Sequence, residues 1–216
     1  MTLIVKDTGG TDFEPIPEDQ HIARCVLLAD VGTQKTPFGT KRQAIIGWEV
    51  PGVQRVFDEA RGEEPAFISA FYTASLADKA NLRRVLESWR GRAFTAEELT
   101  GFDLETILGA PCLLQIIHKQ TADHTRAHVQ GVSKLPTGLD CPTQHCPSRT
   151  FSFASPSRPQ FDAMPEWIQK QIMAAAEWQA LQRQQPAGTQ ANDFDAITAT
   201  EPFSGDGVAK ADETPF

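Results

Sequence analysis

The chain has 216 residues, a formal net charge of −8, and an apolar fraction of 40%. This length suits one domain of ordinary size with appendages. No apolar run approaches the roughly 18 residues of a membrane helix, and residues 1–10 lack the basic start and apolar stretch of a signal peptide. We therefore expect a cytoplasmic protein without a membrane partner.

The negative charge is concentrated at the two ends of the chain. Residues 1–20 contain one lysine and five acidic residues, and residues 186–216 contain one lysine and six. The body between them is nearly neutral, so the overall charge does not exclude a basic groove for nucleic acid. We expect residues 1–20 to form an extended arm and residues 186–216, with few branched apolar side chains, to form a disordered acidic tail.

Three β-rich segments follow the arm, and we expect strands at 21–31, 42–50 and 66–73. A helix is expected over 75–89, because Leu82, Val85, Leu86 and Trp89 lie on one helical face and Ser75 with Asp78 resembles a capping box. Two short helical turns should follow, the first opened by the clearer capping box at Thr95. The last two strands are expected at 112–118 and 127–135.

Residues 21–135 therefore contain three strands, a helical insert and two further strands. This is the element order of the OB-fold, a five-stranded Greek-key barrel. We therefore expect a mainly β protein with a helical insert, of the α+β class, although other small α+β folds fit the same order. Residues 136–164 read as a linker or covering loop. Residues 165–185 read as an additional C-terminal helix, with Trp167 and Ile168 among its inward residues.

Single-stranded nucleic acid is held by aromatic rings that stack on bases and by Lys or Arg that meet phosphates. On strand three, Phe67 and Phe71 share one face and Tyr72 the other. We favour Tyr72 as a contact because its hydroxyl suits a wet surface. Trp48 alternates with apolar residues, so a core position is at least as well supported for it, and the arginines of the insert have glutamate partners nearby. The candidate DNA-binding residues are Lys35, Phe38, Lys41, Arg42, Trp48, Tyr72, Arg90, Arg92, Lys119 and Arg126.

The four cysteines give little support for a metal or a disulfide framework. Cys25 and Cys112 lie in apolar runs, where a free Cys usually packs in the core. Cys141, His145 and Cys146 are the only cluster suggesting zinc, but a fourth ligand is missing and adjacent ligands fit one tetrahedron poorly. A plain loop is the favoured reading, and no cofactor is expected. The chain also lacks a phosphate-binding loop and a nucleophile elbow, so we do not expect an enzyme.

The final residues, Ala-Asp-Glu-Thr-Pro-Phe, place two carboxylates before a proline and a terminal phenylalanine. This tip resembles the acidic end of bacterial single-stranded DNA-binding proteins, Asp-Asp-x-Pro-Phe, which recruits replication and repair enzymes. The resemblance implies that Asp212, Glu213, Pro215 and Phe216 bind partner proteins. The ring can fill an apolar pocket while the carboxylate meets an arginine or backbone N–H groups.

The stretch 21–135 also resembles phage-encoded proteins of single-stranded DNA metabolism. The similar motifs are Ala23-Arg24-Cys25, Asp30-Val31-Gly32-Thr33-Gln34, Phe38-Gly39, Trp48-Glu49, Tyr72-Thr73-x-Ser75-Leu76, Asn81-Leu82-Arg83, Ser88-Trp89-Arg90-Gly91-Arg92 and the later Pro165-Glu166-Trp167-Ile168. The resemblance implies a protein that coats single-stranded DNA during replication, recombination and repair in a bacterial host cell. The long insert, the two-cysteine loop and the extra helix depart from ordinary bacterial single-stranded DNA-binding proteins and leave homo-oligomer assembly open. Two alternatives stay open: a replication adaptor without DNA affinity, and a zinc-binding module.

Overall fold

The computed structural model describes residues 14–36, 39–58, 60, 62–120 and 125–184. Within these residues the strands are β1 (Asp19–Thr36), β2 (Gly39–Asp58), β3 (Gly62–Thr73), β4 (Pro111–Gln120), β5 (Thr125–Ser133) and β6 (Arg149–Phe151). The helices are α1 (Asn81–Arg90), α2 (Ala96–Thr100), the 3₁₀ helix η1 (Leu104–Ile107), α3 (Arg158–Asp162), α4 (Glu166–Ala174) and α5 (Ala176–Gln184). The expectation of a mainly β protein with a helical insert is confirmed.

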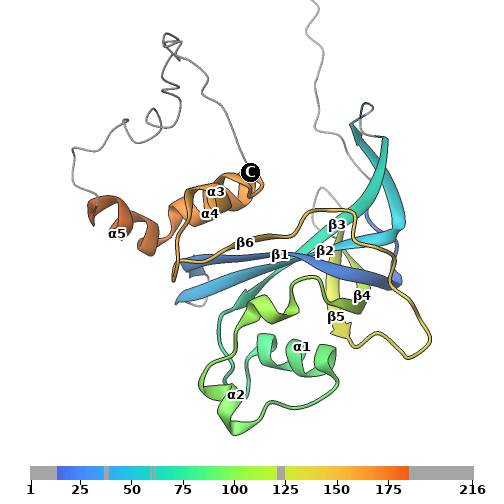
Figure 1. Ribbon diagram of the computed structural model, residues 1–216, viewed down its shortest axis with the longest axis horizontal. Helices are drawn as coiled ribbons and strands as arrows, with labels where there is room; N and C mark the ends of the chain where they lie inside the picture. Colours follow the sequence, from blue (N-terminus) through green and yellow to red (C-terminus); the bar gives the residue numbers. More distant parts are fainter. Residues whose placement is uncertain (1–13, 37–38, 59, 61, 121–124, 185–216) are drawn as a thin grey trace, which may run out of the picture. The chain divides into compact units, whose positions relative to one another are not determined.

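The strands form one strongly curled antiparallel sheet in the order β3-β2-β1-β4-β5 (Figure 1). The long strand β1 belongs to two ladders, because residues 19–24 pair with β4 and residues 24–36 pair with β2. The curl brings β3 and β5, the two ends of this order, into contact. The short strand β6 pairs in parallel with residues 27–29 of β1, beyond the point where β4 ends its pairing.

The concave side of the sheet holds the main core. Alternation along β2 sends Ile46, Trp48 and Val50 inward, and all three side chains are fully buried. The rings of Trp48 and Trp89 of α1 lie with centroids 6.1 Å apart, so the insert closes the core from one side. Cys25 and Cys112 are also fully buried, as their apolar surroundings predict.

The first helix begins later than the sequence suggested. Helix α1 starts at Asn81, and its N-cap residue Ala80 provides no side-chain cap. The hydroxyl of Ser75 instead accepts a hydrogen bond from the N–H of Ala77, which holds the preceding segment in a turn. The capping box at Thr95 is confirmed, because its side chain accepts from Glu98 N–H and the Glu98 carboxylate accepts from Thr95 N–H.

A second core lies on the convex face of β1 and β2, under the segment that follows β5. Leu27 and Ile45 of the sheet are buried there with Ile168 and Ile172 of α4. The expected single helix over 165–185 is wrong, because Ala175 adopts an extended conformation, with ψ of 146°, between α4 and α5. Figure 1 shows the insert on one side of β1 and α3 with α4 on the other.

None of the helices in the described part of the chain is both long and apolar enough to cross a membrane.

Candidate nucleic-acid interface

Two phenylalanines of β3 lie uncovered on the convex face of the sheet. Phe67 is 36% exposed and Phe71 is 47% exposed, whereas Ile68 and Tyr72 between and beside them point into the core. Tyr72 is only 5% exposed, and Trp48 is not exposed at all. The preference for Tyr72 as a DNA contact is therefore wrong, since a ring enclosed by the core cannot stack on a base. Trp48 takes the core position that alternation supported, so it is no longer a candidate DNA contact. The aromatic surface of β3 is the opposite one.

The ring of Phe67 packs closely against a glycine of the neighbouring strand. A Cβ added to Gly47 of β2 would lie 2.5 Å from Cζ and 2.8 Å from Cε2 of Phe67, closer than any real Cβ approaches another atom. Gly47 therefore makes room for the end of the ring, and the side chain still keeps 36% of its surface exposed. The position of this ring depends on the absence of a side chain at residue 47.

A pocket of about 260 Å³ adjoins this ring. Its lining includes Phe57 and Glu64 at the far end of the β2–β3 pair, and His145 and Arg149 from the loop leading to β6. Phe57 is itself 40% exposed. The pocket thus combines two exposed aromatic rings with an arginine, the two kinds of side chain that hold single-stranded nucleic acid.

The loop of residues 139–148, which contributes His145, Cys146 and Pro147 to the lining of this pocket, is fixed by a pair of facing residues on β1 and β2. Arg24 donates to the carbonyls of Gly109 at 2.7 Å and Pro142 at 3.0 Å. Its neighbour in the ladder, Glu49, is fully buried and accepts from His145 N–H at 3.2 Å and Cys146 N–H at 2.8 Å. One charged side chain therefore holds the loop by its carbonyls and the other by its amides.

The same loop contains the cysteines of the zinc alternative. Burial, and then the nearby carboxylate of Glu49, raises the pKa of the Cys146 thiol to about 11, so this sulfur stays protonated near neutral pH. Among the residues that the structure describes, no three His, Cys, Asp or Glu side chains gather at a site for a metal ion. The loop has a structural explanation in Arg24 and Glu49, and the geometry gives zinc at Cys141, His145 and Cys146 no support.

The basic residues predicted near the β1–β2 hairpin divide between the two faces. Lys35 and Lys41 are exposed, and alternation places Lys41 on the same face of β2 as Gly47. Arg42 points to the other face and pairs with Asp30 at 2.5 Å. Phe38 lies outside the described residues.

The remaining predicted contacts lie away from the aromatic face. Lys119 and Arg126 are exposed and stand opposite each other in the β4–β5 ladder. Arg90 and Arg92 both bind the carboxylate of Glu98, and the Arg90 guanidinium also lies 4.5 Å from the centroid of Phe94. Arg90 is therefore a structural residue, as the nearby glutamates had suggested.

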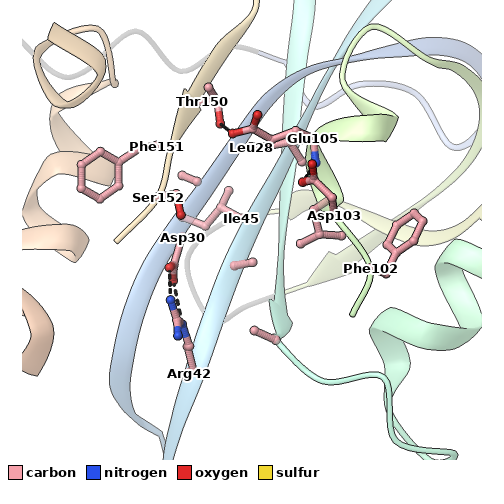
Figure 2. A pocket seen from close by; sticks show the side chains of 14 residues that line it. Leu28, Asp30, Arg42, Ile45, Phe102, Asp103, Glu105, Thr150, Phe151 and Ser152 are labelled. Carbon is pink, nitrogen blue, oxygen red and sulfur yellow. Dashed lines mark hydrogen bonds and ion pairs between the residues drawn. The ribbon is translucent and has the colours of Figure 1, made fainter. Parts of the chain in front are cut away.

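A second pocket, of about 330 Å³, lies between β1, β6 and the insert (Figure 2). Its acidic groups are already engaged: Figure 2 shows Arg42 directed at Asp30 and Thr150 at Glu105. Asp103 caps η1 by accepting from Glu105 N–H at 2.9 Å. These bonds hold the insert and the β1 edge in place, so the pocket reads as a structural junction.

Comparison with known proteins gives no match to a family model and no match to a curated protein. The chemistry of the interface therefore has to be argued from its own residues. The exposure of Phe67 and Phe71 was not predicted, because alternation defines two faces of a strand without saying which is inside. The glycine at position 47, in a strand otherwise rich in large side chains, was the signal that a ring from β3 crosses there.

Proposed function

We propose that the protein binds single-stranded DNA across the convex face of β2 and β3. The observation that carries the proposal is the Phe67 ring, which packs against Gly47 and remains 36% exposed. Phe67 shares a pocket with Phe57, which is also exposed, and exposed apolar side chains that gather in one place often mark a binding site. Every base offers a π-face, so such a ring suits a sequence-tolerant ligand.

The strand order supports an OB-type barrel as the finer description of the fold. The order β3-β2-β1-β4-β5, with β3 approaching β5 and the helical insert between β3 and β4, matches that architecture. In OB-folds, oligonucleotides lie across strands two and three. The exposed rings are on those strands, and Arg149 and Lys41 supply positive charge to the same side of the sheet.

The wider proposal is that the protein coats single-stranded DNA during replication, recombination and repair in the bacterial cytoplasm and has no catalytic role. Its acidic tip, Asp212 to Phe216, lies outside the described residues, and recruitment of partner enzymes through it rests on the sequence resemblance. Binding at the barrel and recruitment by the tip are separate activities in this proposal, so each has its own test.

The test of DNA binding is a fluorescence-anisotropy titration of a labelled oligo-dT at low and high salt, with a duplex of equal length beside it. The proposal expects tighter binding to oligo-dT than to duplex, and weaker binding as salt rises, because phosphate contacts release counterions. Phe67→Ala should weaken binding about five- to 140-fold, since stacking contributes roughly 1–3 kcal/mol per base and 1.4 kcal/mol is a factor of ten.

Leu139→Ala is the matched control, because Leu139 is also apolar and 47% exposed but lies outside the lining of the Phe67 pocket. It should bind oligo-dT as the unaltered protein does. Equal affinity for single strands and duplex would refute DNA coating. Binding of a replication protein by an unaltered barrel with no DNA affinity would point to the adaptor alternative.

A further inference from the structure

We infer that helix α4 is part of the DNA site, and that Trp167 and Phe71 together form a second base-stacking position beyond Phe67. This inference rests on the proposed function and extends it from the barrel to the segment that follows the barrel. The two rings come from elements far apart in the sequence and meet with centroids 6.1 Å apart and planes inclined at 55°.

Both rings remain open to solvent although they touch. Phe71 is 47% exposed and Trp167 is 39% exposed. Their neighbours behave differently, because Ile45, opposite Phe71 in the ladder, and Ile168, next to Trp167, are fully buried. Helix α4 is thus docked through its isoleucines, and the tryptophan is carried at the margin of that contact, over β3.

Several contacts hold α4 and α5 against β1 and so determine the position of Trp167. The carboxylate of Glu177 accepts from Thr33 N–H at 2.8 Å and from the Thr33 hydroxyl at 2.5 Å, and the Gln34 amide donates to the carbonyl of Gln171 at 2.9 Å. Gly32, with φ of +65°, has no room for a Cβ, which would lie 2.7 Å from a Glu177 oxygen and 2.8 Å from Ala175 Cβ. A ring held in place before the ligand arrives loses little freedom on binding.

The position of the pair suggests one path for the nucleic acid. Phe67 and Phe71 are four residues apart on one face of β3, which corresponds to about 13 Å along a strand. Lys41 shares that face of the sheet, and Lys170 is exposed and follows Trp167 by three residues, on the same side of α4. In the described part of the chain, neither lysine has an acidic partner. Stacking rings flanked by free cations suit a strand whose bases are unpaired.

The test uses the tryptophan itself as the reporter. Trp48 and Trp89 are buried, and Trp178 stacks on Phe161 with centroids 4.7 Å apart, so Trp167 is the tryptophan available to a base. Oligo-dT should quench the fluorescence of the unaltered full-length chain. Trp167→Phe should lose most of that quenching while keeping affinity within about threefold, because a phenyl ring still stacks.

Trp167→Ala should weaken oligo-dT binding about five- to 140-fold by anisotropy. Met173→Ala, on the same helix and 44% exposed, lies about 120° around the helix from Trp167 and should have no effect. If the unaltered chain binds oligo-dT but Trp167→Ala binds equally well and Trp167→Phe is still quenched, α4 is not part of the site and the proposed function survives. If the unaltered chain does not bind oligo-dT, the proposed function itself fails.

Discussion

Replacing Gly47 with alanine should displace the Phe67 ring from its position on β2 without removing the side chain. The new Cβ would lie 2.5 Å from Cζ of the ring. The ring therefore has to move by about 1 Å or more to reach an ordinary contact distance of roughly 3.5 Å. The two nearest atoms belong to the far end of a side chain that can rotate outward. Leu27 Cβ of β1, 3.1 Å from the new Cβ, has to give by only a few tenths of an ångström.

The cost in stability should be small. Burying a phenylalanine completely contributes about 1.5–3 kcal/mol, and Phe67 is 36% exposed already. Displacing the ring therefore costs about 1–2 kcal/mol, well below the roughly 5–15 kcal/mol of a typical domain. Gly47→Ala should unfold in urea at a slightly lower midpoint with an unchanged slope. Gly131→Ala is the control, since a Cβ at this β5 glycine meets no atom within 4 Å.

The effect on DNA binding should approach that of Phe67→Ala, because both changes remove the ring from its position on β2. In anisotropy titrations with oligo-dT, the double variant Gly47→Ala/Phe67→Ala should bind no more weakly than Phe67→Ala alone, since residues that act through one contact are not additive. Additive losses would refute the reasoning, because they would mean that Gly47 acts through something other than the ring. So would a Gly47→Ala variant with full affinity when Phe67→Ala has lost it.

Three further outcomes follow from the structure. Glu49→Ala leaves two part-buried N–H groups without their acceptor, each costing up to the roughly 1–3 kcal/mol of a buried group, so urea unfolding should show a loss of about 1–4 kcal/mol; an unchanged midpoint would contradict the role of Glu49 in holding the loop. Hydrogen bonds from Arg92 and from Thr95 N–H lower the pKa of Glu98 from 4.5 to about 2, so its stabilisation is complete above about pH 4.5 and is lost as the pH falls toward 2. Glu98→Gln should make the urea midpoint depend less on pH between about pH 4.5 and 2. An unaltered pH dependence would refute the conclusion that Glu98 titrates with a lowered pKa. Deleting residues 212–216 should keep or slightly strengthen oligo-dT binding, because negative charge is removed, while abolishing capture of replication enzymes by the immobilised chain; loss of DNA binding would contradict the separation of the two activities.

The strands were predictable because local patterns determine them. Alternating apolar residues around Trp48 indicated a strand with that ring inside, and the first five strands appear where they were expected, although β2 continues through Pro51 and Gly52 to Asp58. The Thr95 capping box was also predictable, since both of its residues lie within one turn. The false cap at Ser75 failed because Asp78 pairs with Arg83 of α1 instead.

The site depended on contacts between distant segments, which no local pattern contains. The insert and α4 determine which face of β3 is covered. The sequence of the strand alone therefore could not show which of Tyr72 and Phe71 is exposed. Trp167 was expected to face inward with Ile168, but consecutive helical residues are 100° apart, and docking through Ile168 turns the tryptophan outward. Strand β6 has three residues and was read as part of a linker.

The pairing of β6 with β1 sets a limit on how far the chain can be shortened. A chain ending after residue 135 would keep β1 to β5 but would leave the β1 edge at residues 27–29 without β6, with Leu27 and Ile45 facing water. An open edge beside bare apolar side chains invites other chains to add on as strands. The five-stranded sheet alone should therefore precipitate when it is expressed without the segment that covers it, whereas a chain that keeps β6 and α4 should stay in solution.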